Sequence, residues 1–200
     1  KNTIDPEKII SEYGADAVRM FILSDSPPEK DVQWSEQGII ASYKFIQKFW
    51  TLHVLIKSQI KLNIEKNIKN FDKSIEEFTN QTINKINNNL EKFSYNVIIA
   101  NLHEIYNFYS QAYKTECTNL NDNYIKILKV IFPVLPHFAS ECLSDLTIEE
   151  IKWPAVNKDY LKNSNYKIVV QINGKKRLLF ESNEDLDETN LINKLSLLIY

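Results

Sequence analysis

Six basic side chains are the residues of this sequence best suited to contact a nucleic-acid backbone. A lysine or arginine that neutralises a phosphate releases bound counterions, so such contacts weaken as salt rises. One group lies within a predicted helix and the other follows a predicted turn, an arrangement suited to the shape of a folded RNA and not to its base sequence. The two groups are Lys44, Lys48 and Lys57, and Lys175, Lys176 and Arg177.

Both groups also have an ordinary structural interpretation. Lysines beside an apolar stripe usually form a solvated helix face, and the sequence alone favours this interpretation for the first group. Basic residues on a short strand protect an exposed sheet edge from aggregation. The formal net charge of -2 provides no long-range attraction to nucleic acid, so binding would require a local patch.

No pattern in the chain predicts a catalytic centre or a metal site. His53, His103 and His137 are far apart in the sequence, and none has a second ligand at helical spacing. The carboxylate pairs Glu76-Glu77 and Glu149-Glu150 are typical of helix surfaces, and no serine lies in a nucleophile elbow. A glycine count of 3 disfavours a glycine-rich phosphate loop.

Cysteine use and hydropathy favour a cytoplasmic protein. Cys117 and Cys142 could form a disulfide, but two buried thiols in a reducing cytosol are the preferred interpretation. No apolar run approaches the roughly 20 residues that span a membrane. No secretory signal opens the sequence.

The N-terminal stretch predicts two short helices separated by a glycine. Asp5, followed by proline, is a good N-cap for the first helix. Gly14 is placed to end that helix in a left-handed C-terminal cap. Asp16 can then cap a second, almost wholly apolar helix, and Arg19 lies one turn later, close enough to pair with Asp16.

Apolar residues recur at helical spacing from residue 35 to about 150 and predict five amphipathic helices. Ser35 caps the first, whose wide apolar stripe includes Trp50 and predicts a buried indole. Residues 61–71 predict a connection. Short joints between such helices indicate an antiparallel bundle. The other helices are expected to begin near Asp72, Ser94, Asn121 or Asp122, and Pro136.

After a polar linker over residues 156–165 the pattern changes to an extended one. Residues 166–180 are rich in β-branched and aromatic types, and Asn173-Gly174 in their middle predicts a hairpin with a two-residue turn. Asp187 could cap a following helix. The predicted fold is therefore mainly α, an antiparallel helical bundle followed by the start of a small α/β domain with the order ββα.

Several motifs in this order resemble a known family. Ile4-Asp5-Pro6 followed by Tyr13-Gly14-Ala15-Asp16-Ala17-Val18-Arg19 is similar to the segment after the Lys-Met-Ser-Lys-Ser loop in class I aminoacyl-tRNA synthetases of the leucine, isoleucine and valine group. Pro27-Pro28-Glu29-Lys30-Asp31 and Trp34-Ser35-Glu36, with Phe49-Trp50, resemble the leucyl branch. So do Trp153-Pro154 and Val169-Val170-Gln171-Ile172-Asn173-Gly174-Lys175, although Leu178 and Leu179 depart from that pattern.

The resemblance implies a C-terminal, tRNA-binding part of a leucine–tRNA ligase that begins just after the Lys-Met-Ser-Lys-Ser loop. The whole enzyme would serve protein biosynthesis by activating leucine with ATP and Mg²⁺ and transferring it to tRNA(Leu). This part would lack the catalytic site, bind no cofactor and be inactive alone. The full chain is expected to be a cytoplasmic monomer without a membrane partner.

The resemblance also implies a domain organisation. Residues 1–33 would be the tail of the catalytic domain with the stem-contact region. Residues 34–155 would form an anticodon-binding-type helical bundle, and a linker over residues 156–165 would connect this bundle to a further, C-terminal domain. That domain, begun by residues 166–200, would bind the tRNA elbow.

Two alternatives differ in function. An isoleucyl or valyl synthetase would share the Tyr-Gly-Ala-Asp element but is disfavoured by the Val-Val-Gln-Ile-Asn-Gly run. A non-catalytic helical RNA-binding or scaffold protein is disfavoured because the chain has no initiator methionine and ends within a predicted helix.

Overall fold

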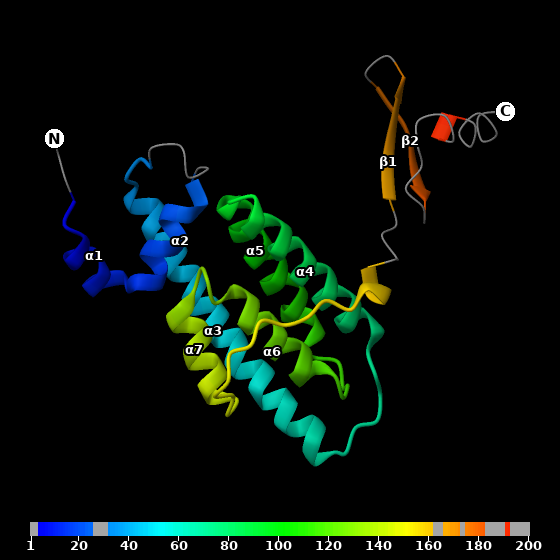
Figure 1. Ribbon diagram of the computed structural model, residues 1–200, viewed down its shortest axis with the longest axis horizontal. Coiled ribbons are helices and arrows are strands. Elements are labelled where there is room, and N and C mark those ends of the chain that lie inside the picture. Colours follow the sequence, from blue (N-terminus) through cyan, green and yellow to red (C-terminus); the bar gives the residue numbers. More distant parts are fainter. Residues whose placement is uncertain (1–3, 26–31, 162–165, 173–174, 183–190, 193–200) are drawn as a thin grey trace. The chain divides into compact units, whose positions relative to one another are not determined.

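The computed structural model describes residues 4–25, 32–161, 166–172, 175–182 and 191–192. Contacts divide the chain into two compact units, Lys1–Asn157 and Lys158–Tyr200, and each is treated by itself. The described part of the first unit is helical (Figure 1), as the sequence predicts. Its helices are α1 (Pro6–Tyr13), α2 (Ala15–Asp25), α3 (Glu36–Glu65), α4 (Lys73–Glu91), α5 (Tyr95–Ala112), α6 (Leu120–Ile131) and α7 (Pro136–Asp145).

The helices begin largely where their capping residues predict. Carboxylate or hydroxyl oxygens of Asp5, Ser35 and Asp72 accept hydrogen bonds from backbone N–H groups in the first turns of α1, α3 and α4. The predicted connection over 61–71 is partly wrong, because α3 continues to Glu65. The predicted start of α6 is also wrong, because the helix begins at Leu120. Local polarity therefore locates both ends of a helix only to within a few residues.

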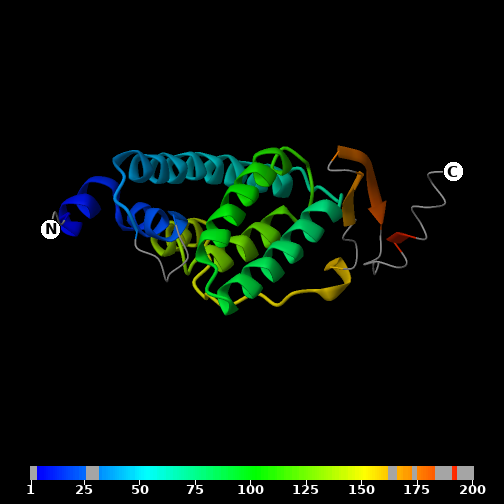
Figure 2. The same ribbon diagram turned by 90° about the horizontal axis from the view of Figure 1, so that it is seen from above.

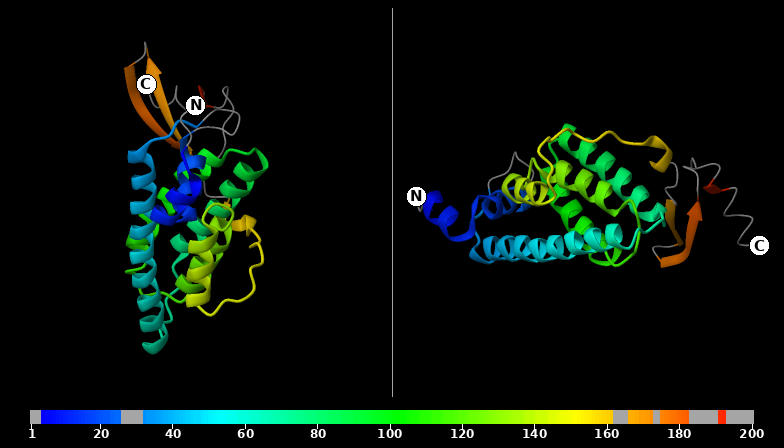
Figure 3. Two further views of the ribbon diagram at one scale, coloured as in Figure 1. Left: turned by 90° about the vertical axis from the view of Figure 1, so that its left-hand side faces the viewer. Right: turned by 90° about the horizontal axis from the view of Figure 1, so that it is seen from below.

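The long helix α3 extends along one side of the first unit, and α4 and α5 cross it obliquely (Figure 2). The short α1 and α2 lie at the N-terminal end of α3 (Figure 3). Gly38 lets α2 approach α3 closely, because a Cβ atom at this position would lie 2.6 Å from Cε2 of Phe21. Gly14 ends α1 with a positive φ of 83°, as predicted, although its ψ of 154° differs from a left-handed helical cap.

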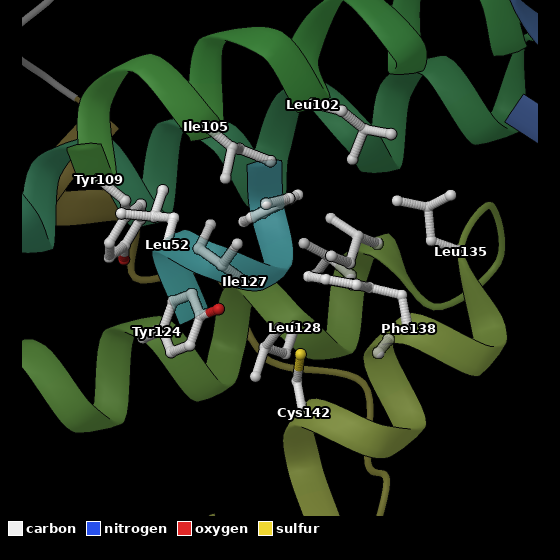
Figure 4. Packing of buried hydrophobic residues seen from close by; sticks show 14 of the residues in the cluster. Leu52, Leu102, Ile105, Tyr109, Tyr124, Ile127, Leu128, Leu135, Phe138 and Cys142 are labelled. Carbon is white, nitrogen blue, oxygen red and sulfur yellow. The ribbon is translucent and has the colours of Figure 1, made fainter. Parts of the chain in front are cut away.

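The main core of the first unit draws on α3 to α7, with Met20 from α2. Leu52, Tyr109, Tyr124 and Phe138 point into one shared interior (Figure 4). The prediction that Trp50 is buried is wrong, because 38% of this residue is exposed whereas Phe49 is 0% exposed. Neighbouring helical residues point roughly 100° apart, so the core takes Phe49 and leaves Trp50 at its edge.

The segment after α7 runs back along α4 in an extended conformation. The indole Nε1 of Trp153 donates a hydrogen bond to Oδ1 of Asn87 at 2.9 Å. Further along, the backbone N–H of Asn157 donates to Oδ1 of Asn80 at 2.7 Å. The Trp-Pro motif therefore fixes the last stretch of the first unit to α4.

Three helices end in residues other than glycine with positive φ. Asn67, Phe93 and Thr147 have φ values of 51°, 53° and 60° after α3, α4 and α7. At the end of α7 the N–H of Ile148 reaches back to the carbonyl of Leu143 at 2.9 Å, as in a Schellman motif. A β-branched threonine is poorly suited to this conformation.

Replacing Thr147 by glycine is therefore expected to stabilise the first unit. The left-handed conformation costs an L-residue roughly 1–2 kcal/mol, part of which glycine regains and part of which it loses to chain entropy. A gain of about 0.5–1 kcal/mol should raise the midpoint of thermal unfolding by a few degrees. The control is Thr51→Gly within α3, which should cost about 1 kcal/mol. Destabilisation by both variants would contradict strain at Thr147.

The second unit contains a β-hairpin, as predicted. Strands β1 (Tyr166–Ile172) and β2 (Lys175–Ser182) are antiparallel, and a short 3₁₀ helix, Lys158–Leu161, precedes them. Ile172 pairs with Lys175, so the connection has two residues, which lie outside the described part of the chain. The helix predicted after Asp187 also lies outside it, apart from residues 191–192, which are helical.

Candidate nucleic-acid interface

The three lysines predicted on α3 do not share one face. Lys44 and Lys48 lie one turn apart and are exposed. Nine residues carry Lys57 roughly half a turn around the helix from Lys48. The ammonium of Lys57 lies 3.0 Å from Oδ1 of Asp145 on α7. The single basic surface expected from the sequence is therefore divided, with Lys44 and Lys48 on one side and Lys57 in an ion pair on the other.

A groove between α3 and α5 brings Lys48 near a lysine that sequence reasoning missed. Lys114 follows the end of α5, and its ammonium lies 5.9 Å from the ring centroid of Tyr113. The only sequence signal was a lysine next to a tyrosine, which is common. We name this hollow of about 230 Å³ the α3–α5 groove; its lining residues are Lys48, Thr51, Leu52, Leu55, Tyr106, Ser110, Tyr113 and Lys114.

The chemistry of the α3–α5 groove suits a ribose–phosphate backbone. It is lined by two lysines and no carboxylate. The hydroxyl of Thr51 donates to the carbonyl of Gln47 at 3.0 Å, and that of Ser110 donates to the carbonyl of Asn107 at 2.7 Å. Because these protons are engaged, both hydroxyl oxygens remain as acceptors, which a ribose 2′-hydroxyl can use as a donor.

Lys57 belongs to a polar cluster that joins α3, α6 and α7. The imidazole of His53 is fully buried; its Nδ1 lies 3.2 Å from the hydroxyl of Tyr124 and its Nε2 lies 3.3 Å from Oδ2 of Asp145. Because a carboxylate can only accept, we assign the proton to Nε2, which leaves Nδ1 to accept from Tyr124. Burial lowers the pKa of His53, although Asp145 opposes this shift. Hydrogen bonds from Lys57 and then His53 lower the pKa of Asp145.

Asp16 and Arg19, which the sequence predicts to pair with each other within α2, bind other partners in the structure. Asp16 lies within the first turn of α2 and does not cap it; its carboxylate accepts from the backbone N–H groups of His137 and Phe138. The guanidinium of Arg19 donates to the carbonyls of Pro133 and Val134. Both predictions for these side chains are therefore wrong, because distant backbone groups offer better partners than the neighbouring turn.

The second predicted basic group lies at the start of β2. Gln171 pairs with Lys176 and Val170 pairs with Leu178, so Arg177 is an extra residue in the second strand. Such a bulge increases the local twist of a hairpin. The side chains of Lys175, Lys176 and Arg177 lie outside the described part of the structure.

Other predicted features concern metals, thiols and membranes. Among the described residues no group of three or more histidine, cysteine or acidic side chains could hold a metal ion. Cys117 and Cys142 are both free and buried, and burial raises the pKa of each thiol. Within the same residues, none of the helices has the length and apolar character needed to cross a membrane.

Comparison with known proteins identifies the class to which this bundle belongs. A family model described as the anticodon-binding domain of tRNA ligase matches residues 72–192. The fold is also similar to a chain of the ternary LeuRS-tRNA-LeuAMS complex from Agrobacterium radiobacter K84, with a TM-score of 0.77 and 22% identity over 97% of this chain and 27% of that one. The chain belongs to the anticodon-binding domain family of tRNA ligases.

The relatives in sequence are leucine–tRNA ligases. The enzyme of Bartonella tribocorum is 34% identical over 191 residues, which are 88% of this chain and 21% of the relative. That of Prochlorococcus marinus (strain MIT 9301) is 32% identical over 196 residues, 95% of this chain and 23% of the relative. These matches confirm the resemblance to leucyl-tRNA synthetases. The chain spans about a fifth of the length of these relatives.

Proposed function

We propose that this chain is the tRNA-binding part of a cytoplasmic, monomeric leucine–tRNA ligase, whose partner is tRNA(Leu). The family match and the leucine–tRNA ligase relatives support this proposal. The full enzyme would activate leucine with ATP and Mg²⁺ and transfer it to the tRNA. We place the sites for leucine, ATP and Mg²⁺ in parts of the ligase beyond this chain, which alone would be inactive.

The observation that carries tRNA binding is the composition of the α3–α5 groove. Lys48 and Lys114 supply positive charge to it, and the absence of a lining carboxylate leaves that charge uncompensated within the groove. Tyr106 and Tyr113 add aromatic surface, on which a base or ribose can pack. Lysine ammonium groups hold phosphates as point charges, so this surface would recognise backbone shape and not sequence.

The other basic residues are expected to contribute to RNA binding to different degrees. Lys44 extends the groove by one turn on the same helix face. Lys57 would contact RNA only by leaving Asp145, so we expect it to contribute least. Lys175, Lys176 and Arg177 at the hairpin form a separate proposed contact with the elbow of the tRNA.

Replacing both Lys48 and Lys114 by alanine in the full ligase should weaken the binding of tRNA(Leu). Two lost phosphate contacts should lower the slope of log affinity against log salt by up to roughly 1–2. Leucine-dependent pyrophosphate exchange should not change, because that step needs no tRNA contact at the groove. Filter binding across a salt series, paired with the exchange assay, makes both measurements.

A matched control is Lys61→Ala with Lys73→Ala. Both lysines are exposed and lie outside the α3–α5 groove, so this variant changes the net charge equally. Equal loss of affinity in the two variants would indicate a general charge effect and contradict a site in the groove. Lys175→Ala with Lys176→Ala, tested in the same series, would report the hairpin contact separately.

A further inference from the structure

Two oppositely charged side chains of α2 both form hydrogen bonds with backbone groups at the connection between α6 and α7. Oδ2 of Asp16 accepts from the N–H of Phe138 at 2.7 Å, and Oδ1 accepts from the N–H of His137 at 3.3 Å. Nη2 of Arg19 donates to the carbonyl of Pro133 at 2.6 Å, and Nε donates to that of Val134 at 3.2 Å. We call Asp16 and Arg19 the α2 clamp.

The α2 clamp supplies what the α6–α7 connection lacks. The residue at the N-cap position of α7 is Leu135, which has no side-chain acceptor, and Pro136 follows it. The first free N–H groups of α7 therefore depend on Asp16, which is 6% exposed. The carboxylate lies at the positive end of the α7 dipole, and Arg19 binds the carbonyls that follow α6. Each charge thus has the sign that its helix end requires.

Packing fixes α2 in the other directions. The ring of Phe21 lies against the backbone of α3 at Gly38, so closely that no side chain would fit there. Met20 is buried in the main core of the bundle. Hydrogen bonds to one helix connection and tight packing on another helix leave α2 little freedom to rotate or slide. The segment before the bundle is therefore a rigid extension of it.

We propose that Asp16 and Arg19 are positioning residues that hold the tRNA-binding bundle at a fixed angle to the aminoacylation centre. The inference rests on the proposed function, in which that centre lies in the rest of the ligase. A tRNA bound at the α3–α5 groove would then present its 3′ end correctly only while the hydrogen bonds of the α2 clamp are formed. Misplacement by about 1 Å can cost a reaction roughly a hundredfold, so a small rotation would suffice.

The test uses the full ligase with Asp16→Ala and, separately, Arg19→Ala. Each variant should lower kcat for tRNA charging by about tenfold or more. Leucine-dependent pyrophosphate exchange and the Kd for tRNA(Leu) should stay within about twofold, because neither the activation step nor the groove is altered. Arg19→Lys, which can reach only one carbonyl, should restore part of kcat. If the wild-type ligase itself did not charge tRNA(Leu), the proposed function would fail, a result distinct from the failure of the clamp.

A charge exchange separates the clamp from a simple ion pair. If Asp16 and Arg19 stabilised each other, the double variant Asp16→Arg with Arg19→Asp would recover charging. The partners are backbone groups whose polarity cannot be exchanged, so this double variant should charge tRNA no better than the worse single variant. Three results would each overturn the proposal. They are recovery of charging by the double variant, an unchanged kcat in both alanine variants, and a parallel loss of pyrophosphate exchange, tRNA binding and charging. The milder Asp16→Asn and Arg19→Lys variants, assayed below their unfolding midpoints, serve if an alanine variant does not fold.

Discussion

Phe49→Ala is expected to lower the free energy of unfolding by about 3–5 kcal/mol, the usual cost of truncating a fully buried aromatic side chain. Phe49 is 0% exposed and lies at the centre of an aromatic group. Its ring centroid is 4.8 Å from that of Phe138 on α7 and 6.1 Å from that of Tyr106 on α5. The cavity would open where α3, α5 and α7 meet. No one of these helices can move to fill it without losing its packing against the other two.

Trp50 provides the matched control from the next position of the same helix. Its ring contacts His53 and the edge of Phe138, with centroids 5.4 Å and 6.4 Å away, but 38% of the residue is exposed. Trp50→Ala should therefore cost roughly 1–2 kcal/mol, a fraction of the transfer free energy of a buried ring. Urea unfolding of both variants, with the slope m unchanged, makes the comparison. Equal costs would mean that α3 does not face the core as described.

This contrast shows how far the sequence determines the bundle. Apolar spacing correctly predicts an amphipathic α3 capped by Ser35, because both signals are local. A wide stripe does not say which residues at its margin are covered, since that depends on where α2 and α7 pack. Trp50 and the neighbouring Phe49 are equivalent in pattern and differ only through tertiary contacts.

The candidate site was less predictable for the same reason. Lys48 could be proposed from its place beside the stripe, but its partner Lys114 comes from a different helix end. Lys57 has the same local pattern as Lys48, and only the position of Asp145 on α7 distinguishes them. Asp16 and Arg19 match a local pairing rule, yet they bind backbone groups more than a hundred residues away. Long-range partners of charged residues are not encoded in spacing.

Acidification is expected to destabilise the first unit through three groups that act in the same direction. Burial lowers the pKa of His53, and hydrogen bonds from Lys57 and His53 lower that of Asp145. Burial would raise the pKa of Glu76 on α4, but hydrogen bonds from Asn123 and Lys126 on α6 outweigh it and lower this pKa. In each case the unfolded chain binds a proton more readily than the folded protein does.

The sign and the pH window follow from linkage. The free energy of unfolding decreases as pH is lowered wherever the unfolded state binds more protons than the folded state. For His53 the loss begins as pH falls through the ordinary value of about 6.5 and continues to its lower folded pKa. For Glu76 and Asp145 the stability is present above their ordinary values of about 4 and is lost as pH falls through their folded pKa values.

Two substitutions separate these windows. His53→Gln keeps an amide donor for Asp145 and removes the titrating ring, so it should abolish the loss of stability that begins as pH falls through about 6.5. At pH 7 it should cost about 1–3 kcal/mol, because the buried hydroxyl of Tyr124 loses its acceptor. Glu76→Gln should leave that first window unchanged and reduce the loss below about pH 4.5. Urea unfolding at pH 7, 5.5 and 4 distinguishes the variants.

The hydrogen bonds of His53 explain why the loss of stability that begins near pH 6.5 can be assigned to this residue. A protonated ring would donate from Nδ1 as well, toward a Tyr124 hydroxyl that now donates to it, so the hydroxyl must rotate within a fully buried site. Lys57 already occupies the other oxygen of Asp145, which limits how far this carboxylate can turn toward a second charge. The folded protein should therefore bind this proton less readily than the unfolded chain as pH falls through about 6.5. If His53→Gln and the wild-type chain lost stability in parallel from pH 7 to 5.5, the ring would not be the group that titrates.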